Sequence, residues 1–280
     1  MWVCINGRYV TEAKGLVSVN NRSFRYGDGC FETMSAQNGI PLLPLLHMER
    51  LFKGLQTLQF EPTSYFTPAY LMQQVQELLQ KNNHLQWARV RITIFRGNGG
   101  LFDAESHRPN WLIQSWPLDP EIKSLNENGL ILHVYNQGFK AADTLANLKS
   151  NNYLLYALAA LAAKKHKAND ALVLNHYGRL ADSTMANLWL QEDERTLVTP
   201  ALAEGPVAGT MRRYLLEQLS IAGWQVLQTE VTVERMLASK AIFLTNAIYG
   251  LKWVQQVQGQ MFTQGAAPGI YRQCIQPLWS

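Results

Sequence analysis

The sequence predicts an α+β protein of two domains, and three observations support this prediction. The chain has 280 residues, which is enough to build two hydrophobic cores. Short strand-like segments and amphipathic helical segments follow one another along both halves. A polar stretch over residues 118–129 interrupts the apolar periodicity. We therefore expect a smaller N-terminal α+β domain over 1–117, a linker over 118–129 and a larger C-terminal domain over 130–280.

The N-terminal domain should combine short strands with two helices. Strands with tight turns are expected in the first forty residues, where Asn38 and Gly39 form a hairpin signal. Leucines spaced three and four residues apart predict helices within 46–58 and 69–83. Alternation of polar and apolar residues over 88–97 predicts a half-buried strand, and "WLIQSWPL" predicts another.

The C-terminal domain should begin with the strand "LILHVYN" and continue into a helix over about residues 152–167. A second helix, "TMRRYLLEQLSIAG", is expected to end at Gly223, since glycine commonly follows the last helical turn. Strands are expected in "ALVLN", "ANLWLQ" and "KAIFLTN", and the following "AIYGLKWV" in a loop that leads into a strand.

Composition excludes several classes of protein. The net charge of +4 is small and the basic residues are scattered, which argues against a nucleic-acid partner. No apolar run is long enough to cross a bilayer. The three cysteines lie far apart, without close histidines, so that neither a metal site nor a disulfide framework is expected. We expect a cytoplasmic protein that acts on a small molecule.

Lys149 lies between a strand-like segment and a predicted helix, where a scaffold can hold a side chain over a site. A lone lysine is more often a solvated charge, so only its neighbours can give it a function. Arg50 shares a helix with the apolar stripe. It suits either a phosphate clamp or an arginine that reaches out to solvent.

Two segments offer sites for an anion. Gly209 and Thr210 precede a predicted helix, whose N-terminus attracts phosphate or carboxylate. Thr245 and Asn246 end an apolar strand, although this pair is also ordinary turn chemistry. Asp182 closes another strand, where a carboxylate could keep a ring nitrogen protonated or serve only the turn.

Together these pieces resemble the class IV aminotransferase family of fold-type IV pyridoxal-phosphate (PLP) enzymes. The resemblance runs almost end to end, in the order and spacing that the family has. The segments that carry it are "RSFRYGDGCFET", "HMERL", the lysine segment from "LKSNN", "LADSTMANLWL", "VAGTMRR" and "FLTNA".

The resemblance implies a role for each candidate. Lys149 becomes the lysine that forms the Schiff base with PLP and moves the substrate proton. Phosphate ligands would be Arg50, Thr210 and Thr245, with Gly209 and Asn246 beside them. Asp182 falls where the family has a glutamate near the pyridine nitrogen, and Tyr153 resembles a tyrosine that contacts the cofactor's phenolic oxygen. The implied fold places the cofactor in a cleft between domains, in a homodimer.

Among its members, aminodeoxychorismate lyases resemble the chain best, through "GDGCF", Thr33, "RGNGG" and "GTMR". In that subgroup the threonine assists the elimination. Phe31, Arg91 and Arg96 are then expected on the substrate side, although Leu101 stands where some lyases have arginine. Two alternatives stay open: a branched-chain or related aminotransferase, and a non-catalytic PLP-binding protein.

Overall fold

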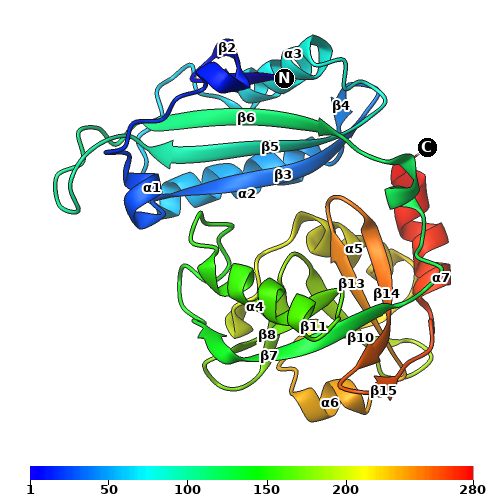
Figure 1. Cartoon of the computed structure of the whole chain (residues 1–280). Helices are drawn as coiled ribbons and strands as arrows, with labels where there is room; N and C mark the ends of the chain where they lie inside the picture. The colour runs from blue at the N-terminus through cyan, green and yellow to red at the C-terminus, as the bar shows by residue number, and fades with distance from the viewer. Residues whose placement is uncertain (280) are drawn as a thin grey trace. The chain divides into compact units, whose positions relative to one another are not determined.

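The computed structural model describes residues 1–279, which form two compact units (Figure 1). The first unit contains Met1–Pro120 together with Leu148–Asn152, and the second contains Glu121–Asn147 with the chain from Tyr153 onward. Each unit combines helices with a sheet, so the α+β prediction is confirmed. The short segment with Lys149 belongs by its contacts to the first unit, whereas the sequence placed it inside the C-terminal domain.

The first unit is built on a six-stranded antiparallel sheet in the order β2-β1-β6-β5-β3-β4. Neighbouring strands pair antiparallel throughout, as short turns between strands allow. The strands are β1 (Trp2–Ile5), β2 (Arg8–Thr11), β3 (Gly29–Gln37), β4 (Ile40–Pro41), β5 (Trp87–Arg96) and β6 (Pro109–Pro117).

Two amphipathic helices cover one face of this sheet, α2 (Pro44–Thr57) against β3 and α3 (Pro68–Lys81) against β6 and β1. Proline occupies the start of both helices, where its missing N–H costs nothing. Their leucine stripes, with Met34, Ile92 and Ile113 of the strands, form the core. The predicted helices are confirmed.

A short helix that the sequence did not predict, α1 (Arg22–Tyr26), precedes β3. Asn21 caps it by accepting hydrogen bonds from the backbone N–H groups of Ser23 and Phe24. It ends at Gly27, whose φ of 69° is left-handed and suits glycine. The turn at Gly27 sends the chain into β3.

The second unit is built on a nine-stranded mixed sheet, ordered β12-β11-β10-β13-β14-β7-β8-β9, with β15 paired to β14. Parallel pairs are β11 with β12, β14 with β7, and β7 with β8. The strands are β7 (Leu130–Lys140), β8 (Asp170–Asn175), β9 (Leu180–Ser183), β10 (Asn187–Gln191), β11 (Thr196–Pro200), β12 (Gln225–Thr229), β13 (Ala241–Asn246), β14 (Gly250–Val257) and β15 (Gln260–Met261).

This sheet curls, because β9 at its edge connects directly to β10 near the other edge. The Ser183 N–H donates to the Ala186 carbonyl at 2.8 Å in the turn between them. The curl brings Leu172, Leu188 and Leu244 into one core. The helices of this unit are α4 (Leu154–Lys165), α5 (Thr210–Ile221), α6 (Val233–Leu237) and α7 (Ala267–Ile270).

Helix α4 packs on β7 and β8, and α5 packs on β12 and β13. Helix α4 begins at Leu154, two residues later than predicted, because Tyr153 has the non-helical backbone of an N-cap. Strand β9 confirms the predicted strand at Asp182 and ends one residue beyond it, whereas β11 and β12 were not predicted. Within residues 1–279, no helix is long and apolar enough to cross a membrane.

Candidate active site

Lys149 is held on the first unit by the backbone of its own segment. The Phe31 N–H donates to the Lys149 carbonyl, and the Asn151 N–H donates to the Gly29 carbonyl, each at 2.9 Å. Cys30 and Ser150 form an antiparallel bridge between these two bonds. The lysine segment therefore extends the edge of β3, which makes Lys149 a fixed residue rather than one on a loose loop.

The two glycines of "YGDGCF" make room for this segment. A Cβ at Gly27 would lie 2.1 Å from Oδ1 of Asn152, and one at Gly29 would lie 2.2 Å from the Ile94 carbonyl oxygen and 2.5 Å from Nδ2 of Asn151. Asn151 donates to that same Ile94 carbonyl at 3.1 Å. The two glycines of "YGDGCF" therefore pack directly against the two asparagines of the lysine segment.

The ring of Phe31 packs against two cationic side chains, those of Lys149 and Arg91. Nζ of Lys149 lies 4.5 Å from the centre of its ring, and Cζ of Arg91 lies 3.7 Å from it. Thr33 pairs with Arg91 across β3 and β5, so both side chains occupy the sheet face of Phe31. Nε of Arg91 donates to Thr93 at 3.1 Å on that face. The structure thus brings together Lys149, Phe31, Thr33 and Arg91.

The opposite face of β3 carries Arg50, in an ion pair with a buried carboxylate. Nε and Nη2 of Arg50 donate to Glu32 at 2.7 and 2.6 Å, and Nδ1 of His47 lies 2.7 Å from it. Burial raises the pKa of Glu32, but the Arg50 charge and the bonds from Arg50 and His47 outweigh it and lower the pKa to about 2. Burial also lowers the pKa of His47.

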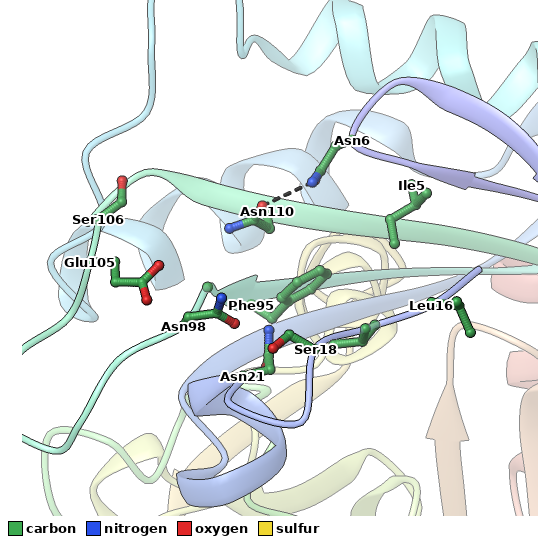
Figure 2. Close-up of a pocket in the computed structure, with 12 residues that line it drawn as sticks. Ile5, Asn6, Leu16, Ser18, Asn21, Phe95, Asn98, Glu105, Ser106 and Asn110 are labelled. Atoms are coloured by element: carbon green, nitrogen blue, oxygen red, sulfur yellow. Dashed lines mark hydrogen bonds between the residues drawn. The ribbon is translucent and has the colours of Figure 1, made fainter. Parts of the chain in front are cut away.

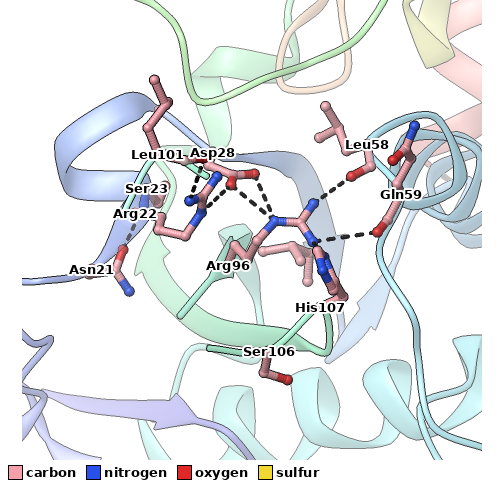
Figure 3. A network of polar contacts seen from close by, with 12 residues as sticks. Asn21, Arg22, Ser23, Asp28, Leu58, Gln59, Arg96, Leu101, Ser106 and His107 are labelled. Carbon is pink, nitrogen blue, oxygen red and sulfur yellow. Dashed lines mark hydrogen bonds and ion pairs between the residues drawn. The ribbon is translucent and has the colours of Figure 1, made fainter. Parts of the chain in front are cut away.

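Arg96, predicted on the substrate side, is instead a buried structural residue (Figure 3). Its Nε donates to both oxygens of Asp28, its Nη2 to the Leu58 carbonyl, and its Nη1 lies 2.9 Å from Nδ1 of His107. Arg22 also binds Asp28, at 2.8 Å. All three guanidinium nitrogens of Arg96 have partners within the protein, so the structure does not support its predicted role in substrate binding. The sequence could not show that Asp28 lies within hydrogen-bonding distance of Arg96.

A separate pocket of about 320 Å³ lies in the first unit (Figure 2). Amides and hydroxyls of Asn6, Asn98, Asn110 and Ser106 line it beside apolar side chains, and Glu105 is its only charged residue. Asn6 already donates to Asn110 at 2.9 Å. None of the predicted site residues lines this pocket, so we assign it no role in the chemistry.

In the second unit, Asp182 is buried within a network of donors. Its Oδ2 accepts from the Lys140 ammonium at 3.1 Å and from the Val207 N–H at 2.8 Å, and the Tyr156 hydroxyl lies 3.0 Å from it. Its Oδ1 has the Tyr156 hydroxyl at 3.1 Å. Lys140 in turn donates to Tyr156 at 2.5 Å. The carboxylate is therefore fixed in position, and most of the donors meet at one of its oxygens.

The loop before α5 passes between Asp182 and Asn187. Val207 donates its N–H to Asp182, and its carbonyl accepts from Nδ2 of Asn187 at 2.8 Å. A Cβ at Gly209 would lie 1.9 Å from Oδ1 of Asn187, so a larger residue here would force the Asn187 side chain or the loop to shift. The N-cap residue of α5, Gly209, has no side chain that could cap the helix. The positive end of the helix dipole lies here and favours an anion.

Asn187 also connects this loop to the second predicted anion segment, because it pairs with Thr245 across β10 and β13. The Thr245 hydroxyl is fully buried and accepts from the Trp189 indole at 2.9 Å. Asn246 closes its own turn: its Oδ1 accepts from Ile248 and Tyr249, and its Nδ2 donates to Met185. For Asn246 the structure therefore favours the turn interpretation.

Three residues of this network were missed by the sequence reasoning. The Tyr156 hydroxyl reaches Asp182, and its ring packs 4.6 Å from that of Tyr153, which the resemblance placed at the cofactor's phenolic oxygen. Lys140 at the end of β7 and Asn187 at the start of β10 complete the set. Tyr156 lies one helical turn beyond Tyr153, which is the one sequence signal that pointed to it.

The chain itself connects the two groups of residues. Asn147, which precedes the lysine segment, donates to the carbonyls of Leu202 and Pro206 and accepts from the Ala208 N–H. Tyr153, which follows the segment, packs on Tyr156. Both ends of the five-residue segment Leu148–Asn152 are thus attached to the network of the second unit.

The sequence and the fold are similar to those of known proteins. A model of the amino-transferase class IV family matches residues 29–257. The chain is 30% identical over 237 residues to the aminodeoxychorismate lyase of Vibrio harveyi, covering 84% of this chain and 85% of the relative.

Two solved structures share the fold. One is the branched-chain aminotransferase of Thermoproteus uzoniensis with norvaline, with a TM-score of 0.89 at 21% identity, covering 99% and 94% of the two chains. The other is the PLP-bound form of a hypothetical aminotransferase from Mycobacterium tuberculosis, with a TM-score of 0.86 at 17% identity, covering 99% and 98%.

Proposed function

Because the chain belongs to the amino-transferase class IV family, we propose that it is an aminodeoxychorismate lyase, which converts 4-amino-4-deoxychorismate to 4-aminobenzoate and pyruvate. Family membership makes it a PLP-dependent enzyme, a lyase or an aminotransferase. The choice of the lyase is our proposal, and it places the enzyme in folate biosynthesis.

The residues of the chain fit PLP at each end of the cofactor. A phosphate suits the N-terminus of α5, where the helix dipole favours an anion, Gly209 has no side chain in the way and Thr210 adds a hydroxyl. The carboxylate of Asp182 suits a protonated pyridine nitrogen, since Oδ1 has only the Tyr156 hydroxyl as a partner. Lys149 would bond to the aldehyde. Arg50 and Thr245 remain proposed phosphate ligands, and Tyr153 a proposed neighbour of the ring.

PLP supplies a carbonyl that bonds to amines and a ring that accepts an electron pair. In the lyase reaction, Lys149 would take the proton from the substrate carbon, and its place beside the Phe31 ring holds its amine on one face of the sheet. Thr33 would donate a hydrogen bond to the departing enolpyruvyl oxygen. Arg91, its partner across the sheet, would bind a substrate carboxylate.

The observation that carries the lyase assignment is the pairing of Thr33 with Arg91 on the face of Phe31. A hydroxyl that assists the elimination of an enolpyruvyl oxygen has no such task in transamination, where no carbon–oxygen single bond of the amino acid is eliminated. The likeness to a lyase over 84% of the chain supports the same choice.

The test is a product assay with purified protein, PLP and 4-amino-4-deoxychorismate. We expect pyruvate and 4-aminobenzoate in equal amounts, without any amino acceptor. Incubation with branched-chain amino acids and 2-oxoglutarate is the comparison. Keto-acid formation there, with no 4-aminobenzoate from the first substrate, would contradict the lyase and assign an aminotransferase.

We further propose that the protein is a cytoplasmic homodimer, as the family resemblance implies. Light scattering on the eluted protein should give twice the chain mass of 31.7 kDa. A monomeric mass together with full lyase activity would contradict this part of the proposal.

A further inference from the structure

We propose that Lys140 is a positioning residue that acts through Tyr156 and Asp182 to set how tightly the protein holds a proton on the pyridine nitrogen of PLP. This inference rests on the proposed function, because it takes Asp182 as the carboxylate beside that nitrogen. It concerns three side chains that all lie within the second unit.

The geometry of the network assigns different tasks to the two oxygens of Asp182. Oδ2 receives the Lys140 ammonium and the Val207 N–H, both within 3.1 Å. Oδ1 contacts the Tyr156 hydroxyl alone. A carboxylate oxygen accepts two hydrogen bonds with ease. Oδ1 can therefore accept a hydrogen bond from a further donor, whereas Lys140 already occupies Oδ2.

Tyr156 cannot act independently of the lysine. A phenol has one proton to give, and Lys140 donates to its oxygen at 2.5 Å while that proton faces Asp182. The order of donation is thus Lys140 to Tyr156 to Asp182. Tyr156 is nine-tenths buried or more, and burial together with the Asp182 charge raises its pKa well above the ordinary value, so it stays a donor.

Lys140 is the cation that pairs with Asp182 in the described part of the chain. An ammonium beside a carboxylate partly cancels its charge, and a carboxylate of lower effective charge stabilises a protonated ring nitrogen less. The other titratable groups on this network are the phenols of Tyr156 and Tyr153. The raised pKa of Tyr156 keeps that phenol neutral, so Lys140 is the cation that sets the balance.

The family has a glutamate where this chain has Asp182, and this difference explains why Lys140 would matter here. Asp182 is one methylene shorter, and the Val207 N–H, Tyr156 and Lys140 together hold it in one orientation. We infer that this chain uses a short carboxylate with a fixed ion pair, so that the position of Oδ1 depends on Lys140.

The test measures the proton on the ring directly. Holoenzyme reconstituted with PLP labelled with ¹⁵N in the ring is titrated by NMR for the wild type, Lys140→Gln and Lys140→Arg. The glutamine removes the charge, whereas the arginine keeps it. We expect the pKa of the ring nitrogen to rise by about one unit or more in Lys140→Gln. In Lys140→Arg it should stay near the wild-type value.

An unchanged ring-nitrogen pKa in Lys140→Gln with PLP bound would overturn the inference. An equal shift in Lys140→Gln and Lys140→Arg would also overturn it, because the effect would then follow shape rather than charge. If Lys140→Gln does not hold PLP, Lys140→Met takes its place, since it also removes the charge and keeps an apolar stem.

The proposed function fails separately. If wild-type protein with PLP has no absorption band that is lost in Lys149→Ala, the proposed chemistry is wrong whatever Lys140 does. If that band is present and the ring-nitrogen pKa is independent of residue 140, only the inference about Lys140 is wrong.

Discussion

Each unit buries a carboxylate beside a cation, and the two differ in how completely that carboxylate is satisfied. Glu32 in the first unit receives both nitrogens of one edge of Arg50 and the His47 ring, all within 2.7 Å. Asp182 in the second unit has its donors gathered at Oδ2 and a single shared hydroxyl at Oδ1. Glu32 is built to stay paired with Arg50, whereas Asp182 has capacity for a partner that is not part of the chain.

The difference teaches which buried carboxylate serves the fold and which serves chemistry. A pKa of about 2 for Glu32 means that its charge is stabilised by the protein alone. Asp182 meets only an amine, a phenol and one N–H, a weaker set than a guanidinium. The following substitutions should separate these roles. The first concerns Lys149, the proposed covalent partner of PLP.

Lys149→Ala should have the largest effect. Turnover should fall by about a thousandfold or more, because both the covalent partner of PLP and the base are lost. The visible absorption of the holoenzyme should disappear. Lys165→Ala, at an exposed position on α4, is the matched control and should behave as the wild type. Turnover that survives Lys149→Ala at the wild-type rate would exclude this lysine from the reaction.

Glu32→Gln should lower the free energy of unfolding by about 3 kcal/mol at pH 7, because Arg50 loses its buried partner. The folded pKa lies below the ordinary value of 4.5, so this stability is present above about pH 5 and is lost as pH falls toward 2.

Urea unfolding of the wild type and Glu32→Gln at pH 7 and pH 3 checks the sign of this effect. The difference between the two proteins should narrow in acid. A difference that is constant across this range would mean that Glu32 is not ionised by its partners in the fold.

Gly209→Ala should weaken PLP binding about tenfold to a hundredfold, since its Cβ would meet Asn187 at 1.9 Å and the loop would have to move. Fluorescence titration with PLP measures it. Gly269→Ala is the control, because a Cβ there meets nothing within 4 Å. Equal affinities for the two variants would show that the close approach to Asn187 does not shape the site.

Two of the arginines of β5, Arg91 and Arg96, should separate substrate binding from folding, and their expected effects are the smallest. Arg91→Gln should raise KM about tenfold with little change in stability, because it loses one charged hydrogen-bonding partner of the substrate. Arg96→Gln should lower the unfolding free energy by about 1–3 kcal/mol, because buried acceptors lose their donor. If Arg96→Gln instead raised KM and Arg91→Gln lowered the unfolding free energy, Arg96 would be the residue on the substrate side.

The sequence predicted the elements that have strong periodicity and missed those that tertiary contacts define. The leucine stripes of α2 and α3 gave both helices, and the apolar runs gave β8, β10 and β13. Short strands such as β11 and β12 carry too few residues to show a period, and α1 depends on its Asn21 cap.

The candidate site divides in the same way. Motif order alone singled out Lys149, Arg50, Asp182 and Gly209, because the residue types and spacing of a family are written in the chain. The linear sequence does not show which side chains these residues contact. Arg96 and Arg91 lie on one strand, and only the sheet register sends one to Asp28 and the other to the face of Phe31.

The sequence by itself determined the family, the lysine and the glycines, because each depends on local chemistry that a linear pattern can hold. The tertiary structure decided which side chains meet: the Tyr156 hydroxyl reaches Asp182, and Lys140 is the cation beside it. Residues 140, 156 and 182 come from β7, α4 and β9. Their contact arises because β7, β8 and β9 are neighbours in one sheet and α4 packs on β7 and β8, and no spacing along the chain encodes it.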